Sequence, residues 1–191
     1  MRQLTLRIAS LLAMACSSSA FAIDGSQLEF SLGTAELDFE NSSNDEDAGR
    51  IAGSFFYPLP TDTTPLTIFA GATLSRSSFD INGIDAEYID GSITFKLEYD
   101  TGKFSPFARF DYIIFSNGDY KGNGVDADLE NEGYELNIGG KLALTPKVSA
   151  SIETTLTANK SFELESGGQS AENDYDYGLF DAFVLAVQYQ L

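Results

Sequence analysis

Apolar and polar residues alternate along most of this 191-residue chain, in short runs that are separated by turn residues. A period of two places alternate side chains on opposite faces of a β-strand. Beyond residue 22 the sequence shows no apolar stripe with the 3.6-residue period of a helix. The pattern predicts eight strands, over residues 27–39, 50–59, 66–76, 92–99, 104–115, 134–144, 148–158 and 181–191.

The first of these runs changes phase partway along its length. Leu28, Phe30 and Leu32 share one face, whereas the apolar residues from Ala35 onward fall on the other. One extra residue in the strand would bring both groups back to the same face. The sequence therefore predicts a β-bulge at Gly33–Thr34.

The connections between the runs alternate between short and long. The short ones are residues 60–65, 100–103 and 145–147, and the long ones are residues 40–49, 77–91, 116–133 and 159–178. A transmembrane barrel has short periplasmic turns and longer outer loops, and its strands need roughly 9–11 residues to cross the bilayer. An even number of strands also places both ends of the barrel on the same side.

In two predicted hairpins, the register shows whether the apolar faces of the two strands lie on the same side of the sheet. Pairing Tyr99 with Phe104 across the turn at 100–103 puts both apolar faces on one side of the sheet. Pairing Leu144 with Val148 across the turn at 145–147 gives the same agreement. Because a slip of one residue would turn every side chain to the other face, this agreement supports the predicted strands.

The second face of the sheet carries charges of both signs. Its candidate members are Glu29, Arg50, Lys96, Glu98, Arg109, Asp111, Glu135, Lys141 and Glu153. A basic residue that faced lipid at the midplane would cost about 2–4 kcal/mol, so these residues are expected inside, as a charge network in the barrel. Lys141 and Glu153 would be diagonal neighbours there.

These observations predict an all-β chain, an eight-stranded antiparallel up-and-down transmembrane β-barrel. Eight strands leave an interior that side chains just fill, so we expect a plugged polar interior rather than an open pore.

The last run ends the chain with large apolar residues at every second position. They are Phe183, Leu185, Val187, Tyr189 and Leu191. This stretch resembles the C-terminal signal of bacterial outer-membrane β-barrels, and the resemblance implies that it closes the barrel and is read by the barrel-assembly machinery. Residues 23–191 as a whole resemble the family of the OmpA membrane domain and its small relatives. The resemblance implies residence in the cell outer membrane, with a structural, adhesive or host- or phage-facing role.

Residues 1–22 have the features of a secretory signal peptide. Arg2 and Arg7 form a positive start, Ile8–Cys16 a short apolar core, and Ala20–Ala22 a cleavage site of small residues. Lipoprotein processing at Cys16 is the alternative. Cleavage after Ala22 leaves 191 − 22 = 169 residues, 23–191, which suit one barrel domain without cysteine.

Removal of the signal also makes the chain more acidic. It leaves 11 − 2 = 9 basic and 29 acidic residues, a net charge of −20. Such an excess repels phosphates, so no nucleic acid is expected as a partner. Most of the acids fall in the predicted long connections, where divalent cations could bridge them to lipopolysaccharide and other outer-membrane lipid.

One acidic stretch, Asp126, Asp128 and Glu130, is a weak candidate for a calcium site. It departs from the calcium-loop pattern because Asn131 stands where a glycine is required and Asn137 where a glutamate is required. We therefore expect no specific metal site and no cofactor.

The sequence contains no histidine. Outer-membrane acyltransferases, deacylases, phospholipases and omptin-type proteases, which this barrel would resemble by fold, use a histidine base. A non-enzymatic role is therefore expected. Two alternatives remain open: a narrow channel or conduit for small molecules across the outer membrane, and a soluble periplasmic lipocalin-like binding barrel.

Overall fold

The computed structural model describes residues 25–39, 46–61, 65–81, 84–122, 125–166, 169–177 and 182–191. The predicted signal peptide and its cleavage site lie outside these ranges. Within the described ranges no helix is long and apolar enough to cross a membrane.

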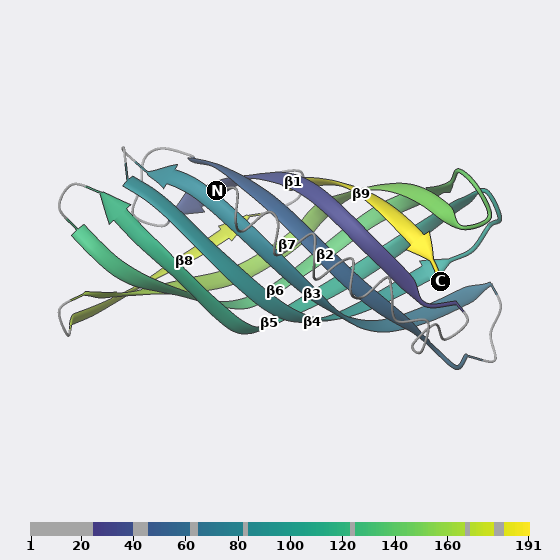
Figure 1. Cartoon of the computed structure of the whole chain (residues 1–191), viewed down its shortest axis with the longest axis horizontal. Helices are drawn as coiled ribbons and strands as arrows, with labels where there is room; N and C mark the ends of the chain where they lie inside the picture. The colour runs from purple at the N-terminus through teal and green to yellow at the C-terminus, as the bar shows by residue number, and fades with distance from the viewer. Residues whose placement is uncertain are drawn as a thin grey trace.

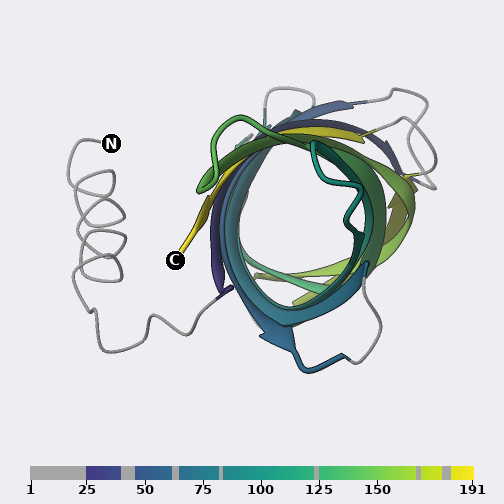
Figure 2. The same cartoon turned by 90° about the vertical axis from the view of Figure 1, so that its right-hand side faces the viewer.

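The described chain consists of antiparallel strands that close into a barrel (Figures 1 and 2). The strands are β1 (Gln27–Phe39), β2 (Glu46–Leu59), β3 (Leu66–Ile81), β4 (Ile84–Tyr99), β5 (Phe104–Gly122), β6 (Val125–Ala143), β7 (Val148–Ser166), β8 (Gln169–Tyr177) and β9 (Ala182–Gln190). Consecutive strands pair from β1 to β8, and β1 pairs in turn with β9 to close the ring.

The eighth position of the ring is shared by two strands in line. β8 pairs with the outer part of β7, and β9 pairs with the inner part of the same strand. Both also pair with β1. The predicted eight-stranded antiparallel barrel is therefore confirmed, with β8 as an addition that the sequence pattern did not reveal.

Both ends of the described barrel chain lie beside the tight turns. Gln27 of β1 pairs with Gln190 of β9, and the Leu191 amide donates to the Ser26 carbonyl over 2.9 Å. The turns from β4 to β5 and from β6 to β7 lie at this end, on the right of Figure 1. In barrels of this kind the short turns face the periplasm.

The prediction of long outer loops is wrong for much of their length. β3 and β4 are separated by two residues, as are β5 and β6, and β7 and β8. β5, β6 and β7 each contain 19 residues, well beyond what a membrane crossing needs. The barrel wall therefore continues outside the membrane as paired β-structure, which we call the outer extension.

The predicted bulge at Gly33–Thr34 is also wrong. β1 pairs with β2 and with β9 in unbroken register through both residues. The phase changes because the environment changes: Ser31 faces a polar interior, whereas Ala35, four residues further out, packs against a buried apolar cluster. The inward face of β1 is therefore polar at Ser31 and apolar at Ala35, although both side chains point into the barrel.

The two predicted hairpin registers have different outcomes. Leu142 pairs with Ala150 and Gly139 with Glu153, so the register of the second hairpin is confirmed. In the first hairpin Lys96 pairs with Arg109 and Glu98 with Phe107, a shift of two residues from the predicted register. A two-residue shift keeps every side chain on its predicted face.

In the part of the barrel between the short turns and the outer extension, apolar side chains face outward. Exposed members of this belt include Phe30, Leu32, Ile51, Leu74, Phe95, Leu97, Tyr112, Ile138, Leu142, Ile152, Leu185 and Tyr189. A soluble lipocalin-like barrel would have the opposite arrangement, so that alternative is not supported.

The outer extension inverts this sidedness. Its buried cluster is apolar and contains Ala48, Phe79, Ala86, Tyr88, Leu129, Ala158 and Ala182. Its outward positions are polar and exposed, as at Ser78, Glu87 and Asp128. The inversion is what burial of apolar area predicts for a wall that passes from lipid into water.

Candidate functional site: the polar interior of the barrel

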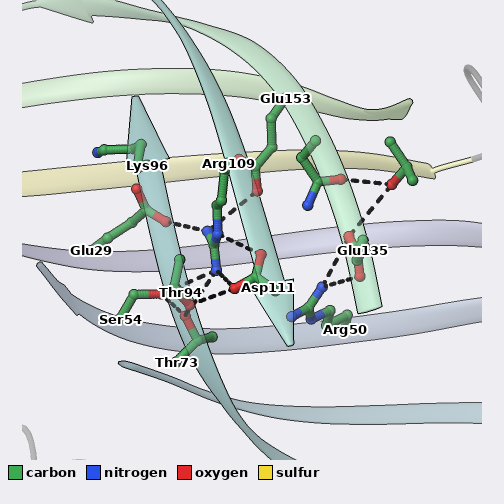
Figure 3. Close-up of polar contacts among 12 residues, drawn as sticks. Glu29, Arg50, Ser54, Thr73, Thr94, Lys96, Arg109, Asp111, Glu135 and Glu153 are labelled. Carbon is green, nitrogen blue, oxygen red and sulfur yellow. Dashed lines mark hydrogen bonds and ion pairs between the residues drawn. The ribbon is translucent and has the colours of Figure 1, made fainter. Parts of the chain in front are cut away.

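The centre of the interior is organised by Arg109 on β5 (Figure 3). Its Nη1 donates to Glu29 Oε1 over 2.8 Å, and its Nε donates to Asp111 Oδ2 over 2.8 Å. A longer contact of 3.5 Å reaches Glu153 Oε1. All four side chains are buried, so one guanidinium holds three carboxylates that belong to β1, β5 and β7.

A row of hydroxyl groups supports this centre from one side. Ser54, Thr73 and Thr94 lie on neighbouring strands and hydrogen-bond in sequence, over 2.9 Å and 2.8 Å. Arg109 Nη2 donates to Thr73 over 2.9 Å, and Thr94 donates to Asp111. Because buried charges need every hydrogen bond they can make, this row fixes the orientation of the Arg109 fork.

Nearer the short turns, Lys96 lies among aromatic rings. Its Nζ is 4.4 Å from the centroid of Phe56, 5.2 Å from Phe69 and 5.6 Å from Phe107. The ammonium group donates to Gln27 Oε1 over 2.8 Å, and it lies 3.7 Å from Glu98 Oε2. Ring faces attract cations, so this cluster places a nearly inaccessible lysine in a position that aromatic rings and a carboxylate stabilise together.

On the opposite side of the centre, Glu135 contacts two bases, Lys160 and Arg50. Its carboxylate accepts from Lys160 over 2.9 Å and lies 3.2 Å from Arg50 Nη1. Thr155 donates to Asn137 over 2.8 Å beside it. Further out, Asn131 Nδ2 donates to Asp90 Oδ2 over 3.0 Å.

The structure places all nine residues of the proposed charge network on the inward face: Glu29, Arg50, Lys96, Glu98, Arg109, Asp111, Glu135, Lys141 and Glu153. They separate into the groups around Arg109, Lys96 and Glu135. The diagonal neighbours Lys141 and Glu153 do not pair: Lys141 binds Glu98, and Glu153 contacts Arg109.

Several residues that fill the barrel interior were not predicted from the sequence. Asp90 and Lys160 were assigned to long loops, and both are buried inside the wall. The rings of Phe56, Phe69 and Phe107 also face inward. A signal for these rings exists in the sequence, because each is a large aromatic residue at a position that the strand alternation assigns to the polar face.

The residues of the proposed C-terminal signal lie along β9 and at its end. Phe183, Leu185, Val187 and Tyr189 are exposed on the outer face and alternate with buried Val184, Ala186 and Gln188. Leu191 follows the strand and is half-buried.

The weak calcium candidates Asp126, Asp128 and Glu130 lie on β6, in an extended strand. Asp128 and Glu130 point outward and are exposed. An extended strand cannot wrap around a cation as a calcium loop does. In the described part of the chain no group of three acidic, histidine or cysteine residues could hold a metal ion.

Comparison with solved structures finds small barrels of the same architecture. Neisserial surface protein A matches with a TM-score of 0.54 at 13% identity, covering 88% of this chain and 98% of that protein. Ail, the attachment invasion locus protein of Yersinia pestis, matches with a TM-score of 0.53 at 9% identity, covering 88% of this chain and 100% of Ail. No curated protein matches the sequence. The outer membrane protein beta-barrel domain matches residues 8–190, and the chain therefore belongs to that family.

Proposed function

We propose that this protein is a non-catalytic, structural and surface-interacting component of the outer membrane. The barrel serves as a closed anchor, and the outer extension is the part that other molecules meet. The observation that carries this proposal is the filled interior: Arg109 with its three carboxylates and Lys96 with its three rings occupy successive levels of the barrel.

A non-catalytic role is supported by the way the buried acids are used. Glu29, Asp111 and Glu153 all contact one arginine, and Glu135 contacts two bases. A carboxylate in general acid–base catalysis needs access to a substrate. These carboxylates instead lie in the packed interior, and the sequence offers no histidine.

The surface role is supported by the charge of the outer extension. Among the described residues of the interior, acids and bases nearly balance, whereas the whole sequence is strongly acidic. Glu87, Asp119, Asp128 and Glu130 are exposed on its outward face. We include in the proposal divalent cations that join such acids to lipopolysaccharide phosphates, and assembly machinery that reads β9.

A channel is the second candidate, and planar-bilayer conductance separates the two. We expect the wild-type protein to stay at baseline. The double variant Phe56→Ala/Lys96→Ala removes Lys96 and the ring nearest to its ammonium group and should give discrete openings, whereas Phe95→Ala on the outward face should not. Steady conductance by the wild-type protein would reject the closed anchor.

A further inference from the structure

The wall of the barrel is interrupted between β5 and β6. Tyr112 pairs with Tyr134, and the next pair is Gly118 with Leu129. Between these pairs, residues 113–117 of β5 and 130–133 of β6 have no partner in each other's strand. β5 is also irregular toward β4, since Ser92 pairs with Ile113 and Gly91 with Phe115.

The interruption contains a pocket of about 620 Å³. This volume is in the range of small-molecule sites. The pocket is lined by residues 113–117 on β5, residues 130–132 on β6 and Ser161 on β7. Inward-facing Ile113 and Asn131 and outward-facing Ile114 and Glu130 share the lining, so the pocket lies within the wall itself.

The lining is divided into an apolar and a polar part. Ile114 and Phe115 are exposed and continue the apolar outer belt, which includes the neighbouring Tyr112. Glu130 and Glu132 begin the polar surface of the outer extension. The pocket therefore lies at the height where the wall passes from lipid to water, with its apolar part on the lipid side.

The pocket also contains a buried hydroxyl group. Ser116 Oγ lines the pocket and is buried without a hydrogen-bond partner among the described residues. Ser116 interacts with the buried carboxylate of Asp90, which pairs with Ser116 across the strands and accepts a hydrogen bond from Asn131. Buried polar atoms are normally satisfied, so a ligand group that reaches Ser116 would complete the hydrogen bonding of this hydroxyl.

From this arrangement we propose that the β5–β6 interruption is a binding site for a small cationic amphiphile, a molecule with an apolar tail and a protonated amine head. The tail lies against Ile114 and Phe115 on the membrane side. The head lies between the carboxylates of Glu130 and Glu132 and donates toward Ser116. The interior bases Lys160 and Arg50 bind Glu135, and the charged residues of the lining are Glu130 and Glu132.

A single tryptophan can report on this pocket because the sequence contains none. The reporter variant is Phe115→Trp, reconstituted in phosphatidylcholine vesicles. The probes are a nitroxide-labelled dodecylammonium and a nitroxide-labelled dodecyl sulfate of the same chain length. Leu32→Trp on β1, four strands away around the ring in either direction, measures quenching by probe that is merely dissolved in the bilayer.

We expect saturable quenching of Phe115→Trp by the ammonium probe only, and a shallow, non-saturating response from Leu32→Trp. Adding Glu130→Gln and Glu132→Gln should weaken binding about tenfold, since two exposed charge contacts are lost. The matched control, Glu87→Gln with Asp128→Asn, makes the same change in net charge outside the pocket and should leave binding within about twofold.

Three results would overturn the proposal: no saturable quenching, equal quenching by the sulfate probe, or equal weakening by the control pair. A gel shift between boiled and unboiled samples establishes that each variant is folded. Binding at this site is independent of conductance. Absence of binding in the quenching experiment would therefore not contradict the proposal of a closed anchor, and conductance by the wild-type protein would not contradict the proposed binding site.

Discussion

Arg109 shows how one residue can determine the interior. Its guanidinium reaches carboxylates on three strands, two of which are far from it in sequence: Glu29 is 80 residues away and Glu153 is 44. A planar fork can serve several acceptors at once, which a lysine ammonium does less well. Removal of this group would leave three buried carboxylates without their common partner.

We therefore expect Arg109→Ala to lower the free energy of unfolding by about 3–5 kcal/mol, the usual cost of breaking a buried ion pair. Urea unfolding in phosphatidylcholine vesicles measures it. Arg76→Ala is the control, because Arg76 and Glu87 form a pair with side chains 34% and 48% exposed. Exposed pairs contribute about 1 kcal/mol or less. Equal losses for the two variants would show that the interior network does not stabilise the barrel.

Phe79 provides a test of the packing of the outer extension. It is buried in the apolar cluster of the outer extension, with its ring centroid 6.1 Å from that of Tyr88. Phe79→Ala should cost about 3–5 kcal/mol if the extension unfolds together with the barrel. Its exposed neighbour Ser78 provides the control, as Ser78→Ala should change stability by less than about 0.5 kcal/mol. A neutral Phe79→Ala would mean that the extension is not packed as described or that it unfolds separately from the barrel.

Among the elements, β9 combines two roles that lie on opposite faces. Its inward residues complete the interior, as where Gln188 donates to Glu29. Its outward residues Phe183, Leu185, Val187 and Tyr189 continue the apolar belt. The strand also closes the ring by pairing with both β1 and β7.

The assembly role proposed for β9 predicts a difference between its two faces. Tyr189→Asp should reduce the amount of heat-modifiable protein in the outer-membrane fraction several-fold, because it places a charge in the apolar stripe near the end of the chain. Gln190→Asp introduces the same group one residue later, off the stripe, and should have little effect. If both variants assemble like the wild type, the stripe is not the signal.

Individual strands also show what a period of two can and cannot predict. It predicts the face of each residue, because lipid and the polar interior impose opposite requirements. It cannot distinguish registers that differ by two residues, which is why the predicted pairing of Tyr99 with Phe104 placed Lys96 opposite Phe107 rather than Arg109. Turn geometry decides that choice, and the sequence of residues 100–103 did not reveal it.

For the whole molecule, the change of environment along the barrel axis explains both the successes and the errors. Within the membrane the alternation is regular, and it predicted the eight-stranded closed barrel. In the outer extension polar residues face outward and apolar residues such as Tyr88 and Leu129 face inward. The segments of the outer extension are rich in acidic residues, so they resemble loops in a sequence that does not show which strands pair.

The interior network could be predicted only in part for a related reason. The alternation of side chains along a strand assigns Glu135 and Arg109 to the inward face. It does not predict which base forms an ion pair with which acid. Those pairs form across the barrel between residues far apart in sequence, as in the 85-residue separation of Arg50 and Glu135. The shape of the barrel and the length of each side chain determine these pairs, and a single sequence does not give the shape of the barrel.

The exposed side chains of Leu97, Phe110, Ile138 and Leu185 belong to the apolar belt, which we infer to face lipid. Single tryptophans at these four positions, in vesicles of brominated phosphatidylcholine, test this orientation most directly. We expect strong quenching relative to ordinary lipid at all four positions and little at Asp128→Trp, which lies in the outer extension. Belt tryptophans that brominated lipid leaves unquenched, and that aqueous acrylamide quenches as well as it quenches Asp128→Trp, would contradict the proposed orientation of the wall.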